Sequence, residues 1–191
     1  MPYSVQHKQQ SRKRILESAY RCFMGRGYAQ TTIDEVMADA GMTRGAFYAH
    51  FSTKDDLYQS AIEYAAMNSY IADQKPDGMS DSNWLSALLK IYLSDAHIAF
   101  EGRPCPLAAL VNDVAIRDDG VRKSYTHSYK GFNRIVNQSL GQDASRTPTS
   151  LAVTAMMIGG VAIARAVEDT GLRRELLESC HALARELLEL E

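Results

Sequence analysis

The residues best suited to chemistry are a group of hydrogen-bond donors between residues 43 and 50. Guanidinium, hydroxyl and imidazole groups donate to phosphate oxygens and base edges, and small residues let a helix backbone approach both closely. The donors are Thr43, Arg44, Tyr48 and His50, and the small residues are Gly45 and Ala46. Arg44 can donate two parallel bonds to a guanine, and a phosphate contact is its alternative role. The group therefore favours contact with DNA.

Two short helices separated by a glycine turn are predicted to position these donors. Thr32 and Glu35 have the spacing of a capping box, which predicts that a helix begins there, and Gly41 ends it. Residues 43–51 form a second helix that is too short to be stable by itself. A longer helix is expected over about residues 9–26. The pair is typical of a helix-turn-helix, whose second helix enters the major groove, and a generic helical hairpin is the alternative.

Charge is distributed unevenly along the chain. Residues 1–54 contain eight basic and four acidic residues, a net charge of +4, whereas the remainder contains 13 basic and 19 acidic residues, a net charge of −6. A basic segment followed by an acidic one indicates a polyanionic partner at one end of the protein only. A random fluctuation of surface charge is the alternative interpretation.

The whole sequence predicts an all-α fold of about nine helices. Apolar residues make up 46% of the chain and charged residues 23%, which is ordinary for a globular protein, and no alternating strand pattern occurs. Gly27 is expected to end the first helix, and residues 75–78 to form a linker. Further helices are expected over about residues 53–73, 81–101, 106–117, 120–140, 149–169 and 172–190.

The run from Ala40 to Leu57 resembles the signature of the TetR/AcrR family of regulators. It reads AGMTRGAFYAHFSTKDDL, and the family pattern is roughly AGVSRGTLYxHFxSKExL. The match covers about residues 10–58 and departs from the pattern at Met37, where a small alanine is usual. The resemblance implies a helix-turn-helix DNA-binding domain over residues 1–54 and a ligand-binding and dimerisation domain over residues 55–191.

The resemblance also implies a function and a role for each donor. The protein would be a transcriptional regulator, in the usual mode of the family a repressor, that binds a palindromic operator as a dimer and is released by a small-molecule or thiol-reactive inducer. Phosphate contacts would come from Thr32, Thr43, Tyr48, His50 and Lys54, and base contacts from Arg44, Gly45 and Ala46.

The acidic segment carries two further patterns. The last two helices combine small residues with leucines at near-heptad spacing, which favours a four-helix dimer interface, with intramolecular core as the alternative. These residues are Leu151, Ala155, Gly159, Ala162 and Ala166, then Leu172, Leu176, Leu183 and Leu187. A pocket for a small apolar or aromatic ligand would be lined by Trp84, Leu88, Tyr92, Phe100, Cys105, Tyr125, Phe132 and Met156. Simple packing is the alternative role of each.

Cys105 lies between Pro104 and Pro106, which predicts a position at the N-cap of a helix. The helix dipole, the free backbone N–H groups and the neighbouring Arg103 would each lower the pKa of its thiol. The residue is therefore a candidate sensor of oxidants or electrophiles. An inert small residue that caps the helix is the alternative.

Other classes of protein have weaker support in the sequence. An enzyme would have to combine Cys105 with His97 or His127, but no phosphate loop, nucleophile elbow or paired-carboxylate site occurs. A helical adaptor that has lost DNA binding is a third alternative. No metal site and no cofactor is expected, because the cysteines and histidines lack ligand spacing. Residues 1–10 are polar and the uncharged run at residues 147–164 is interrupted, so we expect a cytoplasmic protein outside the membrane.

Overall fold

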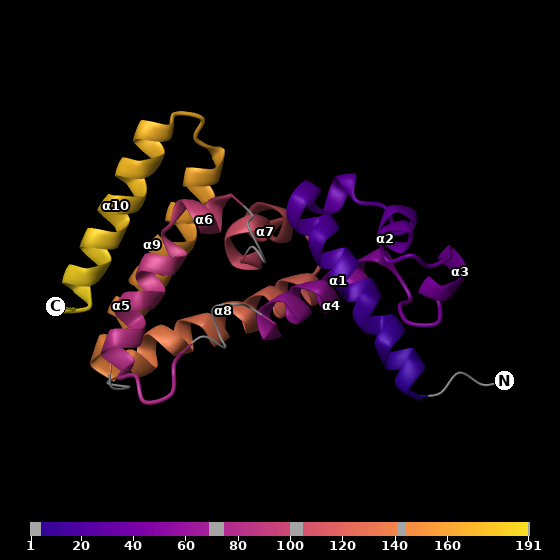
Figure 1. Cartoon of the computed structure of the whole chain (residues 1–191), viewed down its shortest axis with the longest axis horizontal. Helices are drawn as coiled ribbons and strands as arrows, with labels where there is room; N and C mark the ends of the chain where they lie inside the picture. Colours follow the sequence, from indigo (N-terminus) through magenta and orange to yellow (C-terminus); the bar gives the residue numbers. More distant parts are fainter. Residues whose placement is uncertain (1–4, 69–74, 100–104, 141–143, 191) are drawn as a thin grey trace. The chain divides into compact units, whose positions relative to one another are not determined.

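The computed structural model describes residues 5–68, 75–99, 105–140 and 144–190 (Figure 1). Within these residues the chain is helical and contains no strand, so the predicted all-α class is confirmed. The α-helices are α1 (Val5–Gln30), α2 (Ile33–Asp39), α3 (Arg44–Phe47), α4 (Lys54–Met67), α5 (Asp81–Tyr92), α6 (Asp95–Ile98), α7 (Pro106–Ala115), α8 (Asp119–Ser139), α9 (Thr147–Ala166) and α10 (Thr170–Leu187). A 3-10 helix, η1 (Ala144–Arg146), precedes α9.

The helix expected over residues 81–101 is interrupted, and that prediction is wrong in this detail. Leu93 has a non-helical backbone, with φ −92° and ψ 52°, and ends α5. Ser94 then caps α6, because its hydroxyl accepts a hydrogen bond from the backbone N–H of His97 at 3.3 Å. The sequence signal for a second helix start is a single serine, Ser94, within an apolar run. Because the apolar residues keep helical spacing through this serine, periodicity alone predicts one continuous helix.

Gly27 interrupts α1 as predicted. Its φ of 75° and ψ of 175° are not helical, although the hydrogen-bond pattern continues to Gln30. A side chain here would also be obstructed, since an added Cβ would lie 2.7 Å from Oδ2 of Asp113. Glycine is required for both reasons, and the chain turns at this point toward α2.

The chain divides into two compact units. The head unit comprises residues up to 67 together with 110–128, and the body unit comprises 68–109 and 129 onward, as far as these residues are described. In the head unit α1 packs against α4 and α2. Its apolar face follows the predicted spacing, because Ile15, Ala19 and Phe23 are all fully buried.

The body unit is built on α9, which packs against α10 and also contacts α5 and α6 (Figure 1). Val153, Met157 and Val161 of α9 are buried in this core. Among the described residues α9 is also the one helix long and apolar enough to cross a membrane, with a mean hydropathy of 1.5. This is weak evidence for a membrane span, because core helices of soluble proteins have the same composition.

Candidate nucleic-acid interface

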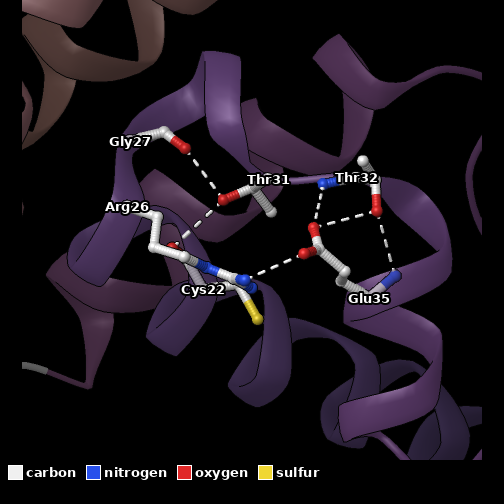
Figure 2. A network of polar contacts seen from close by, with 6 residues as sticks. All are labelled: Cys22, Arg26, Gly27, Thr31, Thr32 and Glu35. Carbon is white, nitrogen blue, oxygen red and sulfur yellow. Dashed lines mark hydrogen bonds and ion pairs between the residues drawn. The ribbon is translucent and has the colours of Figure 1, made fainter.

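Thr32 begins α2 with the predicted capping box, which Figure 2 shows. The Thr32 hydroxyl oxygen accepts a hydrogen bond from the backbone N–H of Glu35 at 3.2 Å, and the Glu35 carboxylate accepts one from the backbone N–H of Thr32 at 2.8 Å. The hydroxyl proton of Thr32 is also donated to Glu35, at 2.9 Å. A phosphate that binds Thr32 would therefore compete with this carboxylate.

Hydrogen bonds and an ion pair connect the start of α2 to the part of α1 just before and at Gly27. The buried hydroxyl of Thr31 donates to the carbonyl oxygens of Gly27 at 2.8 Å and Cys22 at 3.1 Å (Figure 2). Glu35 also forms an ion pair with Arg26 at 2.9 Å. The hydrogen bonds from Thr32, followed by the charge of Arg26, lower the pKa of the Glu35 carboxyl. These contacts hold the N-terminus of α2 in one orientation.

Helix α3 presents one face to solvent and buries the other. Phe47 is 0% exposed and its ring contacts that of Phe51, whereas Tyr48 is 60% exposed. Arg44 and Gly45 are also exposed. Thr43 has the extended backbone of an N-cap, but its hydroxyl makes no capping hydrogen bond within the described residues. The exposed face therefore carries the donors that the sequence predicts.

Arg44 is paired with an acidic residue of the neighbouring helix. Its guanidinium lies 2.6 Å from Oδ2 of Asp34, and both side chains are more than half exposed. A hydrogen bond with Tyr48, followed by the charge of Asp34, raises the pKa of the guanidinium. Exposed pairs of this kind contribute little to stability, so a phosphate or a base edge can replace the carboxylate at low cost.

Lys54 is bound inside the head unit instead of extending freely into solvent. Its Nζ donates to the carbonyl oxygen of Tyr28 at 2.6 Å and lies 4.0 Å from the centroid of the Tyr28 ring. The guanidinium of Arg117 lies 4.4 Å from the same centroid. Burial, followed by the charge of Arg117, lowers the pKa of Lys54. A phosphate contact by Lys54 would have to replace or share the bond to Tyr28.

His50 is half-buried at the end of the helix-turn-helix. Burial, followed by the charges of Lys8 and Arg12, lowers the pKa of His50 and so favours the neutral ring. Arg12 donates to the His50 carbonyl oxygen at 3.0 Å and stacks on Phe51 at 4.3 Å. The Nδ1 atom of His50 is buried and has no hydrogen-bond partner among the described residues.

The residues predicted to line a ligand pocket are only partly brought together. Trp84, Leu88, Tyr92 and Phe132 are buried in the body unit, where the rings of Tyr92 and Phe132 stack at 5.1 Å. Met156 is half-buried in the same unit, whereas Tyr125 belongs to the head unit. Phe100 lies outside the described residues. Tyr92 and Phe132, in the core of the body unit, are thus predicted pocket residues whose rings contact each other directly.

Cys105 occupies the predicted position but not the predicted chemical environment. It precedes α7, and its carbonyl oxygen accepts from the N–H of Ala109 at 3.2 Å, as at an N-cap. Burial raises the pKa of its thiol and outweighs the lowering by the Tyr92 hydroxyl, which donates to Sγ at 3.4 Å, and by backbone N–H groups. The predicted lowering of the pKa is therefore wrong, because the expectation neglected burial.

The Cys105 thiol is accordingly expected to react slowly with electrophiles. In a Cys22→Ser, Cys180→Ser protein, iodoacetamide should alkylate Cys105 more slowly at pH 7 than it alkylates N-acetylcysteine, because less thiolate is present. The rate should still rise at a pH where the free thiol is already ionised. A rate that levels off near neutral pH, measured by mass spectrometry of the modified protein, would contradict this result.

Three residues of the head unit were not predicted from the sequence. Asp34 holds Arg44, and Arg117 and Asp113 hold Tyr28, whose backbone N–H donates to Oδ2 of Asp113 at 2.8 Å. Asp113 and Arg117 lie more than 80 residues from Tyr28 along the chain. No spacing rule links such residues to Tyr28, because Asp113 lies in the last turn of α7 and Arg117 lies two residues beyond its end.

Comparison with known proteins finds similarity to bacterial regulators. Residues 15–61 match the family described as "Bacterial regulatory proteins, tetR family". The chain is 44% identical over 55 residues to the HTH-type transcriptional regulator TtgR of Pseudomonas putida, a segment that covers 29% of this chain and 26% of that protein. The matched segment of this chain spans only 19% to 26% of the length of the first curated relatives.

Other similarities extend over most of the chain. The HTH-type transcriptional regulator LmrA of Bacillus subtilis (strain 168) is 25% identical over 162 residues, which cover 79% of this chain and 84% of that protein. The structure titled "Crystal structure of E.coli NemR reduced form" has a TM-score of 0.77 at 17% identity, and the match covers 93% and 96% of the two chains. At this identity the likeness to NemR concerns the fold alone.

Proposed function

We propose that this chain is a transcriptional repressor of the TetR type that binds a palindromic operator as a dimer, because residues 15–61 match the model of that family. The observation that supports this most directly is the exposed face of α3, which presents Arg44, Gly45 and Tyr48 opposite the buried Phe47. A gel-shift assay with DNA upstream of its own and neighbouring genes tests the proposal.

The two subunits would each insert α3 into a major groove. Half-sites would then lie about 34 Å apart, one helical turn of DNA, or a multiple of that distance. Arg44 would read a base edge with Gly45 and Ala46 close to the groove floor. Phosphates would be bound by Thr32, Thr43, Tyr48, His50 and Lys54. Residues 1–54 supply all of these contacts, and residues 55–191 would hold the ligand and the partner subunit.

The role of Arg44 leads to a pair of variants with opposite effects. Arg44→Ala should weaken operator binding by about 1–3 kcal/mol and reduce the preference for operator over random DNA. Asp34→Asn should strengthen binding, because it removes the carboxylate that holds Arg44 and a negative charge close to the DNA. Fluorescence anisotropy with labelled operator and random duplexes measures both.

Arg174→Ala is the matched control for Arg44→Ala. Arg174 is an exposed arginine of α10 on the opposite side of the helix from Leu172 and Leu183, so the variant loses the same charge outside the head unit and away from the apolar face of α10. If Arg44→Ala and Arg174→Ala reduce operator affinity equally, net charge explains the loss and the base-contact role of Arg44 is wrong.

Dimerisation is proposed to use the solvent face of α9 and α10. These helices pack against each other within one chain, yet they leave several large apolar side chains exposed. The exposed residues are Leu151, Ile163, Leu172, Leu183 and Leu187. An added Cβ on Gly159 meets nothing within 4 Å, so a partner helix could approach this position closely. Exposed large apolar side chains on two neighbouring helices are typical of an interface.

Release by a small apolar or aromatic ligand is proposed to act through α7 and α8. Each of these helices contributes residues to both units. In the head unit Asp113 of α7 holds Tyr28, and Ser124 of α8 donates to Glu63 of α4 at 2.8 Å. A ligand that prefers another placement of α7 or α8 would move these contacts and lower DNA affinity by linkage. Such a regulator acts on DNA in the cytoplasm.

A further inference from the structure

An open groove of about 440 Å³ lies in the body unit, between α5 and α10. Ser86 and Lys90 of α5 and Leu93 after it line one side at helical spacing. Leu177, Glu178, His181 and Arg185 line the other side, one turn apart on a single face of α10. This groove shares no residue with the ligand pocket predicted around Tyr92.

The floor of the groove is apolar and its rim is charged. Leu93 and Leu177 are buried, whereas Lys90 and Glu178 are exposed and His181 and Arg185 are half-buried. Grooves of this size can hold small molecules, and a few polar groups then determine the orientation of the ligand. A ligand here would need an apolar body and one polar end.

The basic groups of the groove are not neutralised by the protein. Within the described part of the chain neither Lys90 nor Arg185 forms an ion pair, and the buried Nε of Arg185 has no hydrogen-bond partner. A buried donor without an acceptor is costly, so this atom favours a ligand that brings an acceptor. A guanidinium presents paired donors that match a carboxylate.

The net charge of the groove favours a ligand with one negative charge over a ligand with two. Burial, followed by the charges of Arg185 and Lys90, lowers the pKa of His181, which favours the neutral ring. Lys90 and Arg185 then supply two positive charges and Glu178 one negative charge. The net charge of +1 matches one carboxylate and leaves a phosphate dianion incompletely neutralised.

We propose that the groove between α5 and α10 is a second ligand site, which binds a small organic carboxylate with its anionic group on Arg185 and Lys90 and its apolar part on Leu93 and Leu177. The neutral His181 ring donates a further hydrogen bond. This site requires neither DNA binding nor the aromatic pocket, so it stands apart from the proposed repressor function.

Benzoate titrated into the full-length protein tests the proposal, with benzamide as its neutral analogue and inorganic phosphate as a competitor. Calorimetry should show saturable binding of benzoate, and amide NMR shifts should concentrate at the groove residues. Benzamide should bind at least about tenfold more weakly, the expected size of a lost charge-assisted hydrogen bond. Phosphate at equal concentration should not displace benzoate.

Arg185→Gln and Lys90→Gln should each weaken benzoate binding about tenfold or more, whereas Arg134→Gln should leave it unchanged. Arg134 is an exposed arginine of α8 that does not line the groove. Lys90 is exposed, so its variant tests the site even if Arg185→Gln disturbs folding. The proposal is overturned if benzoate shows no saturable binding, if benzamide binds equally well, if phosphate displaces benzoate, or if Arg134→Gln has the same effect as the two groove variants.

Discussion

Replacing Leu183 with arginine is expected to convert the protein from a dimer to a monomer and to weaken operator binding by about 10²–10⁴-fold. Leu183 is 47% exposed in the single chain and lies on the apolar face of α10 with Leu172 and Leu187. A buried arginine without a partner cannot be accommodated in an apolar interface. Only a dimer can occupy both half-sites of the operator at once. The loss of dimerisation therefore also removes the additional affinity that comes from binding two half-sites together.

The matched control for this variant is Ala182→Arg. Ala182 is exposed and adjacent in sequence, but the 100° turn per residue places it away from the apolar face. The same charge is therefore added to the same helix, and the dimer should persist. Size-exclusion chromatography with light scattering measures the mass, and anisotropy measures the DNA affinity. An intact dimer in Leu183→Arg would show that the interface lies elsewhere.

Phe47→Ala is expected to cost about 3–5 kcal/mol of the free energy of unfolding of the head unit, the usual loss for a deleted core phenylalanine. Phe47 is 0% exposed, and its ring contacts those of Tyr48 at 5.1 Å and Phe51 at 5.8 Å. Helix α3 has only four residues and depends on this anchor for its position. Operator binding should be lost together with stability.

The neighbouring variant Tyr48→Ala separates the two effects. Tyr48 is 60% exposed, so its removal should change stability by less than about 1 kcal/mol while it weakens binding to all DNA sequences. Urea denaturation followed by far-UV circular dichroism measures the stability of both variants. Equal unfolding midpoints for Phe47→Ala and wild type would contradict the anchoring role.

The features predictable from the sequence are those determined by residues close together along the chain. The capping box of Thr32 and Glu35 and the positive φ of Gly27 depend on neighbours within four residues, and both are present. The inward face of Ile15, Ala19 and Phe23 follows from helical spacing in the same way. The division of roles at residue 54 stays a prediction.

The features that could not be predicted depend on partners far away in sequence. Lys54 was assigned to phosphates from its position in the motif, but its bond to Tyr28 exists only after folding. The pKa of Cys105 depends on burial, which its two flanking prolines do not reveal. The break at Leu93 is local, but one serine is a weaker signal than an apolar run that continues through it.

Trp84 gives the protein a built-in optical reporter of one unit. It is the single tryptophan of the sequence, it is 5% exposed, and it lies in α5 of the body unit. Intrinsic fluorescence excited at the red edge of the absorption band therefore comes from the body unit, and the helix-turn-helix contributes only tyrosine and phenylalanine. A denaturation curve recorded by this emission follows the loss of structure around α5. Far-UV circular dichroism averages over the helices of both units, so the difference between the two curves measures how independently the head unit unfolds.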